Sequence, residues 1–158
     1  MFAFSVYFAL RFDVIQNEAD PLYPLAEKYR ADAFTVHLKP DYSIPKAQRC
    51  EVETLDEIGN ALEEIEGLLR EYIFPFFSSC SDLAAVERLL NRYPGKPATS
   101  NMGARAITGV VAAALCRRSD FSEIVARYRD VLGRSTESIR KQFEAAVVHA
   151  TTNILNTK

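Results

Sequence analysis

Apolar and polar positions alternate along the N-terminal part of the chain. Large apolar residues fill every even position from Phe2 to Val14. A period of two places these side chains on one face of a β-strand, whereas a helix would scatter them around its circumference. Shorter strands are predicted at 34–38 and 48–53, and the proline-containing stretch 16–32 is predicted to be a loop. The first third of the chain therefore predicts a small, mostly antiparallel sheet.

The apolar spacing changes from two to three or four after Thr54, which predicts a long helix over about 55–73. The stretch from Thr54 to Glu57 has the form of a capping box, in which the threonine hydroxyl and the glutamate carboxylate each accept a backbone N–H. Pro75 is expected to end this helix, because the residue before a proline is pushed out of the α region.

Helical periodicity continues to the end of the chain. Further helices are predicted at about 81–93, 103–118, 120–132 and 136–154. Ser79 or Ser81 is the expected N-cap of the first, and Gly133 is expected to be a left-handed residue after the third. Strands followed by helices predict an α+β fold, in which about five helices pack on the small sheet and on each other.

The length of 158 residues, with 48% apolar and 25% charged residues, predicts one globular domain over 1–158. The stretch PGKPATSNMG at 94–103 is the most linker-like part of the chain. A subdivision there would separate a strand-plus-helix part, 1–93, from a helical part, 104–158. One cooperative unit is the prediction.

Several classes of protein are excluded by composition. The longest apolar run, Val110 to Cys116, is too short to span a bilayer. A signal peptide has basic residues before its apolar region, and this N-terminus has none. The three cysteines are odd in number and widely spaced, which argues against a disulfide framework and a zinc site. The sequence predicts a cytoplasmic protein with no membrane partner and no cofactor.

Charge is unevenly distributed along the chain. Residues 1–91 carry 8 Lys and Arg against 16 Asp and Glu, a net charge of −8, whereas residues 92–158 carry 11 against 5, a net charge of +6. The acids of the long predicted helix form a candidate face for docking a basic protein, or a solvated surface: Asp56, Glu57, Glu63, Glu64 and Glu66. The basic residues of the C-terminal half are spread over three predicted helices, which disfavours a nucleic-acid surface.

Catalytic motifs are absent from the sequence. It has no glycine-rich phosphate loop, no G-x-S-x-G and no H-E-x-x-H. This favours a non-catalytic binding or regulatory protein. The alternative is a small-ligand-binding protein or an atypical enzyme, with a cleft between the sheet and the C-terminal helices formed by Tyr7, Arg11 and His37. A homo-oligomer is a third prediction, because the first strand would lie at a sheet edge.

The stretch from Cys50 to Tyr93 also carries a resemblance. It combines an extended segment leading into a polar helix start (52–55), the sequence PFF at 75–77 and the sequence DLAAVERLL at 82–90. Together with the alternating N-terminus, residues 2–93 resemble a group of uncharacterised bacterial domains found among small cytosolic and toxin-immunity-like proteins. The resemblance implies a binding or regulatory protein rather than an enzyme, and it brings no catalytic residue to this chain.

Overall fold

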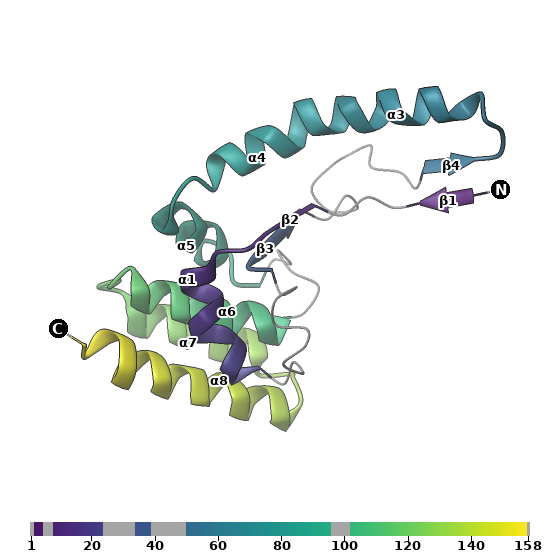
Figure 1. The fold of residues 1–158 in the computed structure, drawn as a ribbon. Helices are drawn as coiled ribbons and strands as arrows, with labels where there is room; N and C mark the ends of the chain where they lie inside the picture. The colour runs from purple at the N-terminus through teal and green to yellow at the C-terminus, as the bar shows by residue number, and fades with distance from the viewer. Residues whose placement is uncertain (1, 5–7, 24–33, 39–49, 96–101, 158) are drawn as a thin grey trace.

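The computed structural model describes residues 2–4, 8–23, 34–38, 50–95 and 102–157 (Figure 1). Most of these residues are helical. The α-helices are α1 (Asp13–Ala19), α3 (Glu57–Leu68), α4 (Phe74–Ser79), α5 (Leu83–Asn91), α6 (Met102–Leu115), α7 (Phe121–Leu132) and α8 (Glu137–His149). The described residues also include a 3-10 helix and two π-helical segments: η1 (Asp20–Leu22), η3 (Leu69–Ile73) and η4 (Ala150–Leu155).

The strands within the described residues are only three residues long: β1 (Phe2–Phe4), β2 (Phe8–Leu10), β3 (Val36–Leu38) and β4 (Cys50–Val52). β1 pairs antiparallel with β4 and β2 with β3, and the two pairs share no strand. The predicted α+β fold is therefore wrong, because the described residues are mainly helical and the helices around α6 pack on one another without a sheet layer. Two-stranded pairs of this length offer too little apolar surface to form a layer of the core.

The alternating N-terminus does not form one long strand. After β2 the backbone N–H of Phe12 donates to the Thr35 hydroxyl (2.8 Å), and the Phe12 carbonyl accepts from the N–H groups of Ile15 and Gln16 (both 2.9 Å). With these contacts, α1 begins at the end of the segment predicted to be a strand and continues into the segment predicted to be a loop. Ile15 is then fully buried in the core. Tertiary contacts with Thr35 therefore override an apolar pattern that favoured a strand.

Helix α6 lies at the centre of the core and contacts α1, α5, α7 and α8 (Figure 1). Its residues from Arg105 to Ala114 are all buried, and most have small side chains, which allow neighbouring helices to approach closely. The predicted helices at 103–118, 120–132 and 136–154 are confirmed as α6, α7 and α8 with η4. The predicted left-handed conformation of Gly133 is wrong, because its φ is −54°.

Gly109 is the point of closest approach between α6 and its neighbours. A Cβ atom there would collide with the Tyr128 hydroxyl and would lie 2.6 Å from Asn91 Oδ1. The space is occupied by buried hydrogen bonds: the Tyr128 hydroxyl lies 2.9 Å from Asn91 Oδ1 and 3.0 Å from the Leu90 carbonyl, and Asn91 Nδ2 donates to the Gly109 carbonyl (3.0 Å). The absence of a side chain at Gly109 therefore leaves room for the hydrogen bonds that connect α5, α6 and α7.

The long predicted helix does not end before Pro75. α3 continues through η3 into α4, and the N–H of Phe74 donates to the carbonyl of Leu69, five residues back. The widened turn accommodates the proline in the first turn of α4, where its missing N–H costs little. The N-cap of the next helix, α5, is Asp82, which accepts from the Ala85 N–H (2.7 Å), and not Ser79 or Ser81.

We expect Gly109→Ala to destabilise the protein by about 1–3 kcal/mol, because the new methyl group displaces the Tyr128 hydroxyl from its buried partners. The free energy of unfolding in urea measures this loss. Gly67→Ala in α3 is the matched control, since no neighbouring atom lies within 4 Å of the place that its new methyl group would take. This control should be neutral or should stabilise its helix by up to about 1 kcal/mol. Equal stability of the two variants would contradict the close-contact role of Gly109.

Candidate functional site

Helix α3 presents a largely exposed face. Ala61 is its one buried residue, and the side chains of Leu55, Ile58 and Leu62 near its start are 84%, 41% and 60% exposed. Among the described residues its closest packing is with β4 and η3, and it extends away from the helices around α6 (Figure 1). Large apolar side chains of an amphipathic helix therefore face solvent instead of the core, which is typical of an interaction surface.

The predicted acidic residues lie on this helix, but not on one side of it. At 3.6 residues per turn, Glu66 lies on the same side of the helix as Leu62, Glu63 and Asp56 lie about 100–120° away, and Glu64 lies on the far side. All four are exposed. No three carboxylates among the described residues gather into a group that could hold a metal ion.

Glu57 has a local structural role. Its Oε2 accepts from the backbone N–H groups of Glu53 (2.6 Å) and Thr54 (3.4 Å), so half of the predicted capping box forms and α3 begins at Glu57. Glu66 also has a partner, because Arg70 Nη2 donates to it (2.6 Å) one turn further along. The acids of α3 therefore remain on the surface, and the exposed apolar residues lie among them.

Two of the three predicted cleft side chains, those of Tyr7 and His37, lie outside the part of the structure that is described. The backbone of His37 belongs to β3. The guanidinium of Arg11 pairs with Asp13 (2.6 Å) and Asp20 (3.4 Å) at the two ends of α1. The hydrogen bond with Asp13 raises the pKa of Arg11. Arg11 therefore stabilises α1.

Comparison with protein-family models, with curated proteins and with solved structures finds no match to this chain. The family resemblance stays a prediction from residues 2–93 alone. Within the described part of the chain, no helix combines the length and the apolar character needed to cross a membrane.

A second feature, which the sequence did not predict, is a pocket of about 670 Å³ between α5, the turn from α6 to α7, and α7 itself. We call it the arginine pocket, because four arginines line it. Its described lining residues are Ser79, Ala85, Arg88, Leu89, Asn91, Arg92, Tyr93, Arg118, Asp120 and Arg127.

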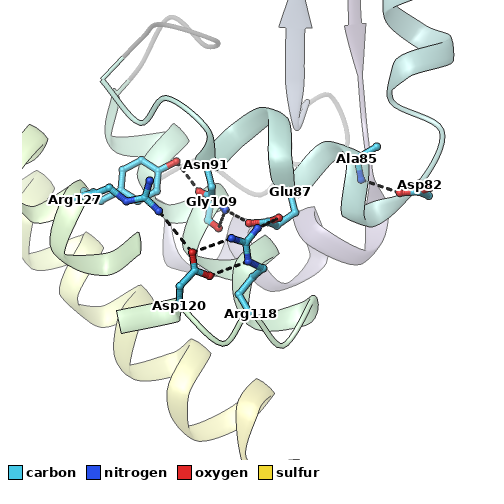
Figure 2. Close-up of polar contacts among 9 residues, drawn as sticks. Asp82, Ala85, Glu87, Asn91, Gly109, Arg118, Asp120 and Arg127 are labelled. Atoms are coloured by element: carbon cyan, nitrogen blue, oxygen red, sulfur yellow. Dashed lines mark hydrogen bonds and ion pairs between the residues drawn. The ribbon is translucent and has the colours of Figure 1, made fainter. Parts of the chain in front are cut away.

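Arg118 is fixed in the wall of the arginine pocket by two carboxylates (Figure 2). Its Nε and Nη2 donate to the two oxygens of Asp120 (both 2.8 Å), and its Nη1 donates to the buried Glu87 (2.8 Å). Arg127 approaches the same Asp120 more loosely, at 3.9 Å. The bidentate bond to Arg118 lowers the pKa of Asp120, and the bonds to Asp120 and Glu87 raise the pKa of Arg118.

The backbone before Arg118 has an unusual conformation. Arg117 has a φ of 49°, in the left-handed region that usually favours glycine. The N–H of Arg117 donates to the carbonyl of Ala114 (2.9 Å), and that of Arg118 donates to the carbonyl of Ala113 (3.1 Å). This turn ends α6 and directs Arg118 back toward α5. The sequence has no glycine here to mark such a turn, so the position of Arg118 could not be predicted.

We expect Asp120→Asn to be less stable than the wild type at pH 7 and to lose less stability on acidification. The pKa of Asp120 is lower in the folded state than in the unfolded chain, so its contribution is present above about pH 4 and is lost as the pH falls. Urea unfolding at pH 7, 5 and 3 measures both effects. Asp130→Asn, an exposed site on α7, removes the same charge and is the control. Identical pH profiles of wild type and Asp120→Asn would contradict the ion pair.

Proposed function

We propose that this chain is a protein-binding domain of the regulatory, immunity-like kind, and that α3 is its contact surface. The observation that carries the proposal is the exposure of Ile58 and Leu62 on α3, and of Leu55 just before it, on a helix that the described core does not cover. An amphipathic helix that places its apolar side chains in solvent matches the mode of recognition in which a helix lies in an apolar groove of its partner.

The negative charge of α3 indicates which kind of partner surface it would bind. Residues 51–68 contain seven acidic residues and no Lys or Arg. Glu66 lies one turn from the exposed Leu62 on the same side of the helix, so a partner that covers this leucine also meets the Glu66 carboxylate. We therefore propose a partner protein with an apolar groove flanked by lysines or arginines. Complementary charge of this kind raises the association rate and selects the partner.

A photo-crosslinking residue placed at position 62 in the source cells should capture this partner, whereas the same residue at Asp130 on α7 should not. With the captured protein purified, we expect the variant Glu63→Lys/Glu64→Lys/Glu66→Lys to bind it at least about tenfold more weakly, since Glu66 and its acidic neighbours become cations that repel the basic residues of the partner. Titration calorimetry at two salt concentrations measures the affinity and its dependence on charge.

The matched control is Glu123→Lys/Asp130→Lys/Glu137→Lys, which makes the same change of charge on α7 and α8. It should retain wild-type affinity. Equal weakening of the two triple variants would show an effect of net charge alone and would overturn the proposal. Capture of a second copy of this chain, or of a partner whose contact surface is acidic, would overturn it as well.

A further inference from the structure

The arginine pocket carries an excess of positive charge that the described residues do not neutralise. Arg88, Arg92, Arg118 and Arg127 line it, together with one carboxylate, Asp120. The buried Glu87 behind the wall supplies a second negative charge. Four guanidinium groups against two carboxylates leave an excess of two positive charges, and both carboxylates already bind Arg118.

Arg88 and Arg92 are the cations that remain for a ligand. They are one turn apart on the exposed side of α5, and among the described residues neither has a carboxylate within ion-pair distance. Like charges at this spacing repel each other. The guanidinium of Arg92 lies over the ring of Tyr93, 5.3 Å from its centroid, which orients it at the rim of the pocket. An anion between the two arginines would relieve their repulsion.

The end of α5 does not need these arginines as helix caps. The buried Arg105 donates through Nη2 to the carbonyls of Leu90 (2.7 Å) and Tyr93 (3.0 Å), and the Tyr128 hydroxyl lies within hydrogen-bond distance of Leu90 as well. The negative end of the helix is thereby satisfied from inside the core. Arg88 and Arg92, which are both exposed, are therefore not needed to cap the helix.

We propose that the arginine pocket binds a small phosphorylated molecule. Guanidinium groups donate pairs of parallel N–H bonds that match the oxygens of a phosphate group. The volume of about 670 Å³ is that of a site for a small organic ligand and exceeds what a phosphate ion alone would fill. Leu89, Ala85 and the half-exposed ring of Tyr93 provide apolar surface for the organic part, with the carboxamide of Asn91 in the wall.

The test uses the full chain with inorganic phosphate, pyrophosphate and AMP as probes, each compared with sodium chloride at equal ionic strength. We expect AMP or pyrophosphate to bind with one-to-one stoichiometry in calorimetry. Either should raise Tm by about 5–10 °C at a free concentration of about one hundred times Kd. Absence of any rise beyond that in sodium chloride, for both probes, would overturn the proposal.

The variant Arg88→Gln/Arg92→Gln should weaken binding at least about tenfold and lower the rise in Tm to about half or less, while its Tm without probe stays at or above that of the wild type. Arg134→Gln/Lys141→Gln removes the same charge from exposed sites beyond the far end of α7 and should bind as the wild type does. If both double variants bound the probes equally weakly, binding would depend on diffuse positive charge, and the proposal of a pocket site would be overturned.

A single-stranded DNA of 20 nucleotides provides a further arm of the test. Tighter binding of this DNA than of AMP, lost equally in both double variants, would favour an extended basic surface and would also overturn the proposal. The Glu63→Lys/Glu64→Lys/Glu66→Lys variant should bind AMP and pyrophosphate as the wild type does. Phosphate binding and protein binding by α3 can therefore fail independently.

Discussion

The contact of Tyr128 with Asn91 across Gly109 holds the core of this protein together. It requires that α6 have no side chain at this position, because a single methyl group would occupy the place of the hydroxyl. The hydrogen bonds there are buried, so each lost partner would leave a polar group without water. Burial also raises the pKa of Tyr128 to about 12.

The same contact determines where charge can gather. Because α7 is drawn against α5, Arg118, Asp120 and Arg127 come to lie opposite Arg88 and Arg92 on α5. Glu87 and Asp120 are used to hold Arg118, and Arg105 satisfies the end of α5. Arg118 is thus held by two carboxylates and Arg105 by backbone carbonyls, whereas Arg88 and Arg92 line the pocket without a carboxylate partner among the described residues.

Helix α3 has the opposite character. Its exposed face carries acidic residues together with Ile58 and Leu62, and the helix continues through the widened turn at η3 and past Pro75. Ile73, which is fully buried, packs with Tyr72, Phe76 and Phe77 where this long helical segment joins the body of the protein. An acidic apolar helix and a cationic pocket therefore occupy separate parts of the molecule.

The sequence by itself determined the helices of the C-terminal half, because α6, α7 and α8 bury apolar stripes with a clear helical period. It also determined that the acids from Asp56 to Glu66 share one helix. Only the tertiary structure decided that the N-terminal alternation would break into β2 and α1, since Thr35 supplies the hydrogen bond that ends the strand. It alone decided that Arg88 and Arg118 would line one pocket, because the left-handed turn at Arg117 and the missing side chain at Gly109 act between helices, where periodicity along the chain carries no information.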